Sequence, residues 1–295
     1  MARPMASAAA TTPGDVTAAV VRSFVATPDE RLRFLLERMV RHLHEFIEET
    51  QLTQDEWAAA IEFLTATGKA CTPIRQEFVL LSDTLGVSML VDLLANRGTE
   101  TATESTVLGP FYVPGSCTRQ MGESIAERDG YGDPAFVSGT VKSTAGRPID
   151  GAALDVWQNA SNGKYAVQDD QQPEQNLRGK FHTGPDGRFW FWAVRPTDYR
   201  IADDGPVGRM LAATGRHPWR PAHIHLKVSA LGYRPVTTHL FDDESPYLTT
   251  DAVFAVKPSL VCHFERHEPD EPGAPVGCSR TWFSLEHDLV LAEEA

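Results

Sequence analysis

The stretch HPWRPAHIHLKV, residues 217–228, predicts a β-strand with two histidines on one of its faces. Alternate side chains of a strand point to opposite sides of the sheet. For a strand over 222–229, one face carries the apolar side chains Ala222, Ile224, Leu226 and Val228. The other face carries His223, His225, Lys227 and Ser229. The apolar face is expected to pack in the core, so both imidazoles point the same way.

This spacing makes His223 and His225 candidate metal ligands. Residues two apart on a strand have Cα atoms roughly 7 Å apart. Their ring nitrogens can therefore converge on one ion, each at about 2.1 Å. The alternative is that both histidines lie partly exposed on a polar strand face, and the spacing alone does not exclude it.

The neighbouring residues do not identify the metal. Zinc would need another histidine, cysteine or carboxylate. A non-haem Fe(II) oxygenase would need His-x-Asp or His-x-Glu. Here Ile224 lies between the histidines and Leu226 and Lys227 follow them, so neither pattern is met locally. Phenol oxygens are the remaining donors. A tyrosine titrates at about pH 10 in water, so it ligates at neutral pH only where a strongly charged ion such as trivalent iron removes its proton. The chain has six tyrosines, and this argument does not choose among them.

Beyond residue 105 the sequence alternates short strand-like runs with turn residues. Besides the opening stretch, these runs are FVSGTVKS (136–143), AALDVWQN (152–159), FHTGPDGRFWFWAV (181–194), RPVTTHLFDD (234–243), AVFAVKPSLVCHFE (252–265) and RTWFSLEHDL (280–289). The Gly-Pro-Asp-Gly sequence at 184–187 is typical of a turn between two strands. No βαβ rhythm and no dinucleotide or P-loop motif occurs. The pattern predicts a sandwich or barrel of antiparallel sheets.

Before residue 105 the signals are helical. Thr27 is a candidate N-cap for a helix with an apolar stripe over residues 32–47, and Thr53 with Glu56 forms a capping box for a second helix. A third helical stretch is predicted from about Thr72 to Asn96, with Pro73 near its start and Gly98 beyond its end. The fold class predicted is α+β. It comprises a loose N-terminus (1–20), a helical dimerisation or linker domain (21–105) and an antiparallel β-sandwich catalytic domain (106–295).

Composition excludes some classes of function. The formal net charge of −13 argues against nucleic-acid binding, because no basic field offsets phosphate repulsion. Four scattered cysteines form no C-x-x-C pair, which favours a reduced, cytoplasmic setting. No run approaches the roughly 18 apolar residues of a membrane span, and the opening residues contain no apolar core of a signal peptide.

Several motifs in order resemble the intradiol ring-cleavage dioxygenases of the catechol and hydroxyquinol 1,2-dioxygenase type. They are EFVLLSDTLGVSMLVD (77–92), STVLGPFYVPG (105–115), LDVWQNASNGKY (154–165), FHTGPDGRFWFWAVRPTDYRIADDGPVG (181–208) and HPWRPAHIHLKVSALGYRPVTTHLF (217–241). The resemblance covers the chain from about residue 20 to its end. RPAHIH together with the two tyrosine-terminated segments is highly specific for this family.

The resemblance implies one Fe(III) per chain, held by Tyr165, Tyr199, His223 and His225. Carried over by motif position, Tyr199 is the ligand that dissociates and accepts a proton as the substrate binds, and Tyr165 is the ligand that stays. Arg220 matches an arginine beside the bound substrate, where its charge can stabilise a developing anion. The alternative is that Arg220 pairs with Asp203 or Asp204 and only braces the loop.

The family also implies the residues that line the substrate pocket. These are Leu80, Asp83, Val107, Leu108, Gly109, Pro110, Phe111, Ile201, Ala202 and Val253. Asp83 stands among leucines, where a carboxylate is costly without a partner, and a third ring hydroxyl would supply a donor. Asp83 and the room left by Val253 resemble hydroxyquinol enzymes, with 3-hydroxy-cis,cis-muconate as the product. Catechol or a chlorocatechol is the alternative substrate, and Asp83 in a local bond or facing solvent is the alternative for that residue.

Partners follow from the same resemblance. Besides the aromatic diol and O2, it implies a homodimer through the N-terminal helices and a bound phospholipid. The helical stripes can equally pack on the chain's own sheets. His182, His217, His239 and His263 are interpreted as structural or as neighbours of the site. A different class of function also remains open, a non-catalytic β-sandwich binding module with histidines on a polar face.

Overall fold

The computed structural model describes residues 12–72, 75–97, 101–127, 130–269, 271–272 and 280–294. The chain divides into two compact units, Met1–Thr65 and Ala66–Ala295. The boundary lies within helix α3 (Gln54–Ala70). The helices after residue 66 thus belong to the same unit as the sheets, whereas the change in sequence character comes near residue 105.

The first unit consists of α1 (Pro13–Ser23), α2 (Glu30–Thr50) and most of α3. Thr12 and Asp15 form a capping box, so an ordered helix occupies residues 13–20, where the sequence suggested a loose segment. Residues 1–11 lie outside the described part of the chain. The N-cap of α2 is Asp29, whose carboxylate accepts from the Leu32 N–H at 2.9 Å, so the prediction of Thr27 was wrong. The Thr53–Glu56 box of α3 is confirmed.

The third helical stretch is two helices, α4 (Glu77–Thr84) and α5 (Val87–Ala95). Gly86 between them has a φ of 72°, a left-handed conformation that glycine adopts without steric cost, and the two axes differ by 75°. The prediction of one continuous helix was therefore wrong, and Pro73 and Gly98 lie outside the described residues. Among the described helices, none alone has the length and apolar composition to cross a membrane, and α4 with α5 meets that criterion only as a bent pair.

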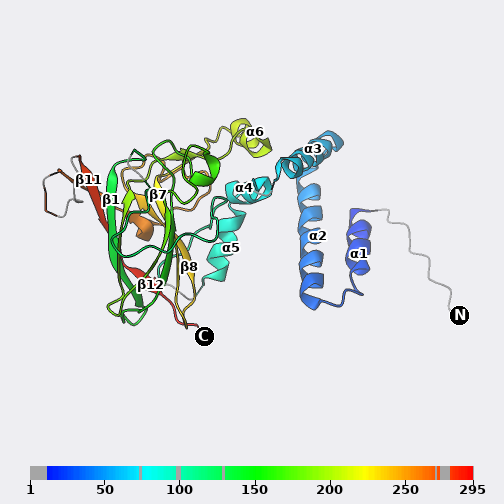
Figure 1. Cartoon of the computed structure of the whole chain (residues 1–295). Helices are drawn as coiled ribbons and strands as arrows, with labels where there is room; N and C mark the ends of the chain where they lie inside the picture. The colour runs from blue at the N-terminus through cyan, green and yellow to red at the C-terminus, as the bar shows by residue number, and fades with distance from the viewer. Residues whose placement is uncertain are drawn as a thin grey trace. The chain divides into compact units, whose positions relative to one another are not determined.

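The second unit is built on two five-stranded sheets (Figure 1). One contains β1 (Pro134–Ser143), β4 (Arg188–Val194), β10 (Glu265–His267), β11 (Trp282–Glu286) and β12 (Leu289–Leu291). The other contains, in order, β3 (Arg178–His182), β2 (Ala153–Trp157), β7 (His223–Ser229), β8 (Val236–Asp242) and β9 (Val261–Cys262). A two-stranded ladder joins β5 (Tyr199–Arg200) to β6 (Trp219–Arg220), and the short helices are η1 (Ala166–Gln168), α6 (Pro206–Ala213) and η2 (Pro258–Leu260).

The sheets are mixed, so the prediction of purely antiparallel sheets was wrong in this respect. β1 runs parallel to β11 and β12, and β8 runs parallel to β9. A strand that joins a sheet after a long connection can pair parallel or antiparallel to its neighbour. More than a hundred residues separate β1 from β11 in the chain. The run 252–265 is mostly loop, with only η2, β9 and the first residue of β10 regular.

The main core lies between the two sheets, and β7 is a central strand of it. Ile224, Leu226 and Val228 are fully buried there, as the alternation predicted. On the other face of the same sheet, α5 packs over β8 through a second cluster that contains Met89, Phe241 and Val253. Figure 1 shows α4 and α5 beside β8. The histidine face of β7 is therefore covered by protein as well.

Candidate metal centre and substrate pocket

Strand β7 brings His223 and His225 together at the buried centre of its sheet. Their Nε2 atoms are 3.1 Å apart, and both residues are 1% exposed. Burial holds the pKa of both imidazoles well below the ordinary value, so both rings are neutral. The Nδ1 of His223 lies 2.7 Å from the Pro221 carbonyl oxygen. That nitrogen therefore carries the proton and donates, which leaves a lone pair on Nε2.

Two tyrosines reach the same place from loops outside the sheet. Tyr165 stands directly before η1, where its backbone N–H donates to the Gln168 side chain at 3.1 Å. Its Oη lies 3.0 Å from His225 Nε2. Tyr199 begins β5, and its ring centroid lies 5.5 Å from that of Tyr165, nearly perpendicular to it. Both phenols are buried, so they can act only within the site.

The donor set fits a metal ion. Ligand atoms bound at about 2.1 Å and at right angles to one another are about 3 Å apart, and the Tyr165–His225 and His223–His225 separations are 3.0 and 3.1 Å. His223 Nε2 carries a lone pair, and His225 with its proton on Nδ1 would present a second lone pair to a shared cation. Burial raises the pKa of Tyr165 well above its ordinary value, so only a strongly charged ion would drive off its proton at neutral pH. Phenolate oxygen with imidazole nitrogen suits ferric iron.

His239 is a third histidine at this centre. It lies opposite His225 in the β7–β8 ladder, and its ring centroid is 4.2 Å from that of His225 and 4.5 Å from that of His223. Each of the three histidines offers one ring nitrogen, and these three nitrogens lie within 4.8 Å of one another. The backbone of Val107 lies near the His239 ring, but among the described residues neither ring nitrogen makes a hydrogen bond of ordinary geometry. The structure thus offers a histidine triad as a second possible ligand set beside the two tyrosines and two histidines.

Arg220 lies above the phenol of Tyr199. Its Nη1 donates to the Tyr199 Oη at 3.1 Å, and its Nε donates to an oxygen of Asp251 at 3.1 Å. The two alternative partners considered from the sequence are occupied elsewhere, since Asp203 pairs with Arg200 and Asp204 with Arg75. Burial disfavours the charged form of Arg220, but Asp251 and Tyr199 outweigh it, and the net effect raises its pKa. Arg220 is therefore a permanent positive charge beside the tyrosines.

A cavity of about 210 Å³ opens over this group of residues. For comparison, an apolar cavity of roughly 150 Å³ accepts one benzene molecule. Seven of the ten pocket residues predicted from the sequence line it, together with the site residues Tyr199 and Arg220; the seven are Leu80, Asp83, Pro110, Phe111, Ile201, Ala202 and Val253. The pocket thus has the size for a single substituted aromatic ring, with mostly apolar walls and an arginine and a phenol at one side.

Three predicted residues do not line this cavity. Val107 is buried in the cluster between α5 and β8, and Leu108 is 41% exposed. Gly109 has a φ of 75° and packs so closely that a Cβ there would lie 3.3 Å from the His225 ring. Gly109 therefore contributes by letting the backbone approach the imidazole.

Asp83 lies in the pocket wall and is 3% exposed. Burial is the main cause that raises the pKa of its carboxyl, opposed by a hydrogen bond from Ser88 and by the charge of Arg220. This influence of Ser88 agrees with the local bond that was the alternative for Asp83, although the Ser88 hydroxyl also lies 2.8 Å from that of Ser82. A bond to Ser88 would occupy only part of the Asp83 carboxylate, which still faces the cavity.

The sequence interpretation missed five further residues that line the pocket, namely Arg75, Gln76, Glu77, Val167 and Gln168. Glu77 is fully buried, pairs with Arg75 at 2.8 Å and accepts from the backbone N–H of Val207 in α6 at 3.1 Å. The signal available was Arg-Gln-Glu directly before an apolar helix. It did not show that Glu77 would point inward rather than to solvent.

The fold and this site define a metal-dependent enzyme with a pocket for one aromatic ring, and comparison with known proteins agrees. The chain matches the family model "Dioxygenase" over residues 107–292 and "Catechol dioxygenase N terminus" over residues 29–103. It is 48% identical to a hydroxyquinol 1,2-dioxygenase of Rhizobium sp. (strain MTP-10005), covering 90% of each chain. It is 46% identical to a hydroxyquinol 1,2-dioxygenase of Rhodococcus opacus, covering 93% of this chain and 92% of that one.

The solved structure of a hydroxyquinol 1,2-dioxygenase from Pseudomonas putida DLL-E4 superposes with a TM-score of 0.89. It is 46% identical, and the match covers 96% of this chain and 99% of that chain. The chain therefore belongs to the intradiol ring-cleavage dioxygenases, the catechol dioxygenase family.

Proposed function

We propose that this protein is a ferric dioxygenase that cleaves hydroxyquinol between its two adjacent hydroxylated carbons with O2. The product would be 3-hydroxy-cis,cis-muconate. The observation that carries the substrate choice is the buried carboxylate of Asp83 in a pocket wall that is otherwise largely apolar. The relatives named hydroxyquinol 1,2-dioxygenases over most of the chain support the same choice.

We assign the iron to Tyr165, Tyr199, His223 and His225. The two adjacent hydroxyl oxygens of the substrate would chelate the ferric ion, and the bound ion would make the ring reactive toward O2. The protein supports this by keeping both imidazoles neutral through burial, so that their lone pairs stay available. The apolar side chains of Leu80, Ile201 and Val253 in the pocket wall would pack against the ring of a bound diol.

Tyr199 and Arg220 handle protons and charge in this proposal. A diol that chelates through both oxygens would lose two protons. The Tyr199 Oη at the edge of the cavity is placed to accept one of them, and the other would pass to solvent. Arg220 donates to that Oη at 3.1 Å, so its positive charge lies beside the atom that would receive the proton. After the transfer, the same guanidinium faces the negative charge of the substrate.

Asp83 recognises the third hydroxyl group. A buried carboxylate gains most from a hydrogen-bond donor that arrives with the ligand, because it has lost the solvation that water would supply. Catechol, the alternative substrate, brings no such donor. It would fit the same cavity but leave Asp83 with its Ser88 contact and the more distant Arg220 charge.

The test is oxygen uptake by the iron-loaded protein with hydroxyquinol and with catechol under identical conditions. We expect kcat/KM for hydroxyquinol to exceed that for catechol by at least about tenfold, the size of one hydrogen bond to a charged group. Equal values would remove the substrate assignment, and no uptake with either diol would overturn the function itself. A colourless protein that prefers zinc would favour the alternative of a binding module.

We also propose a homodimer. Apolar side chains of α2 remain about half exposed within the chain, among them Leu32 (46%), Leu35 (47%) and Met39 (51%). Such a stripe is larger than a monomer usually leaves open and suits a second copy. Sedimentation that shows only a 32.5 kDa species would overturn this. The bound phospholipid and the cytoplasmic location stay predictions.

A further inference from the structure

The guanidinium of Arg220 is a buried charge whose orientation needs a cause. The side chain is 2% exposed and belongs to a strand of only two residues. Among the ion pairs of the described residues, its one carboxylate partner is Asp251, whose side chain is also 2% exposed. A buried pair of this kind is fixed mainly because breaking it would leave one charge uncompensated.

Asp251 contacts the guanidinium along the edge that carries Nε and Nη2, and Nη1 points away from it. Arg220 Nε donates to Oδ1 at 3.1 Å, and Nη2 lies at 3.5 Å from Oδ2. Nη1 is left to donate to the Tyr199 Oη at 3.1 Å. Because the guanidinium is planar, holding Nε and Nη2 at one carboxylate sets the direction in which Nη1 points.

The carboxylate of Asp251 is itself held by the turn that follows it. Oδ1 accepts from the backbone N–H of Val253 at 3.3 Å, and Oδ2 accepts from that of Ala255 at 3.0 Å. Phe254 between them has a φ of 60°, a conformation that a non-glycine residue adopts only where the surroundings impose it. The turn is therefore a tight, side-chain-centred loop around the acid.

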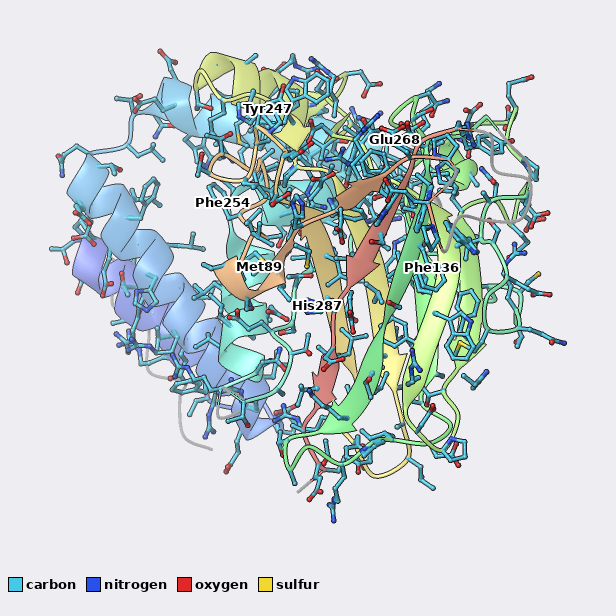
Figure 2. All side chains as sticks on the ribbon, turned by 90° about the vertical axis from the view of Figure 1, so that its left-hand side faces the viewer. Met89, Phe136, Tyr247, Phe254, Glu268 and His287 are labelled. Atoms are coloured by element: carbon cyan, nitrogen blue, oxygen red, sulfur yellow. The ribbon has the colours of Figure 1, made fainter. Side chains whose placement is uncertain are left out.

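Neighbouring elements brace this turn. Arg216 donates to the carbonyl of Ala252 at 2.9 Å and to that of Thr84, at the end of α4, at 2.6 Å. Its guanidinium lies 4.9 Å from the Phe254 ring centroid. Val253 packs in the cluster that contains Met89 of α5, and the Phe254 ring lies beside Gly86, where a Cβ would be 3.6 Å from it. Figure 2 labels Phe254 and Met89, both on the α5 side of the sheets. The carboxylate thus has little freedom to move away from Arg220.

We propose that Asp251 is a positioning residue for ring cleavage, which acts by aiming the Arg220 guanidinium at the phenol of Tyr199. No group of Asp251 touches the cavity or the donor atoms, since both its oxygens face Arg220 and the backbone of its own turn. Its contacts reach the reaction through Arg220. Its charge also acts on the carboxyl of Asp83, an effect that remains in a variant without Arg220 and is therefore separable from the first. The activity part of the test rests on the proposed function, whereas the spectroscopic part needs only bound iron.

The experiment is a double-mutant cycle of Asp251→Asn and Arg220→Gln in the iron-loaded full-length protein. Asp251→Asn alone should lower kcat for hydroxyquinol by about 10- to 100-fold with a smaller change in KM, the cost of a misplaced charged group. In the Arg220→Gln background the same substitution should lower kcat by less than about threefold. An equal loss in both backgrounds would show that Asp251 acts through the fold and would overturn the proposal.

A second readout does not depend on turnover. A tyrosinate bound to ferric iron gives a visible absorption band, and a donor to the phenolate oxygen changes its energy. Asp251→Asn should shift the band maximum of the substrate-free protein, and the shift should vanish in the Arg220→Gln background. No shift in either background would overturn the proposal, even if the protein proved inactive on both diols.

The control is Asp242→Asn, which removes a carboxylate from the pair with Arg195, where the contacts are 2.6 and 3.0 Å. This pair is partly buried, and Arg195 also contacts Glu244. Asp242→Asn should lower the melting temperature but leave the band unshifted. If Asp251→Asn does not fold, Asp251→Glu, which keeps the charge but moves it by one methylene, enters the same cycle. The criterion is the same: the fold-loss of kcat caused by Asp251→Glu must be smaller in the Arg220→Gln background than in the wild type.

Discussion

Tyr199 and Arg220 are direct partners in the two-residue ladder of β5 and β6, and the Nη1 of Arg220 donates to the Tyr199 Oη at 3.1 Å. The proposed proton acceptor and the proposed anion-stabilising charge are thus placed by one backbone register. A two-residue ladder alone is weak, and the Asp251 pair adds a second restraint on the arginine.

Tyr199→Phe tests the proton-acceptor role. The variant should keep part of its iron, because the other three donors remain, but kcat should fall by at least about 100-fold, the lower end of the range for a lost general base. Steady-state kinetics and iron content per chain measure both effects. Tyr112→Phe, which removes only a hydroxyl that donates to Asp155, is the matched control and should stay within about threefold. Unchanged turnover in Tyr199→Phe would refute the assignment.

Colour distinguishes the two possible ligand sets. If the tyrosines ligate, the iron-loaded protein has a broad visible band, which Tyr165→Phe alters and His239→Gln keeps. If the three histidines were the ligands, His239→Gln would lose most of the bound iron, and a ferric protein without tyrosinate would lack the band. Absorption spectra and metal analysis of the three proteins decide between the sets.

Asp83→Ala tests the recognition of the third hydroxyl group. We expect kcat/KM for hydroxyquinol to fall by about 10- to 100-fold, because a hydrogen bond to a charged group contributes roughly 1.5–3 kcal/mol. The loss for catechol should be at most about threefold, since catechol makes no such bond. Ser88→Ala, which removes the local partner of Asp83, is the control for mere disturbance of the helix pair. Equal losses for both diols would contradict the role.

The raised pKa of Asp83 makes a prediction about stability. A carboxyl whose pKa is raised in the folded state favours folding only while it is protonated, so this contribution is present below its ordinary pKa and is lost as the pH rises through the folded value. Asp83→Asn should therefore raise the melting temperature of the metal-free protein at neutral pH. The gain should diminish as the pH falls toward 4, where the wild-type carboxyl is increasingly protonated.

Thermal unfolding at several pH values measures this effect. For chains of this size each kcal/mol corresponds to about 2–4 °C. A variant less stable than the wild type at neutral pH would show that the charge of Asp83 is compensated by Arg220 after all. In that case the substrate hydroxyl would not be needed as its partner.

Much of the site was predictable because it follows from local periodicity. Alternation along β7 placed His223 and His225 on one face, opposite Ile224 and Leu226, and the structure has this arrangement. The Thr53–Glu56 capping box was equally readable, since it needs only residues three apart. Family motifs supplied the two tyrosines, which the residues alone did not single out.

The sequence by itself determined which side chains share a strand face and which residues cap a helix, because the backbone repeats every two residues in a strand and every 3.6 in a helix. Only the tertiary structure decided that Asp251, 31 residues from Arg220, is its counter-charge, and that His239 lies across from His225. It also decided that Gly86 divides α4 from α5 and that β11 runs parallel to β1. Such contacts depend on the register between strands and on how long connections close, and no local periodicity encodes either.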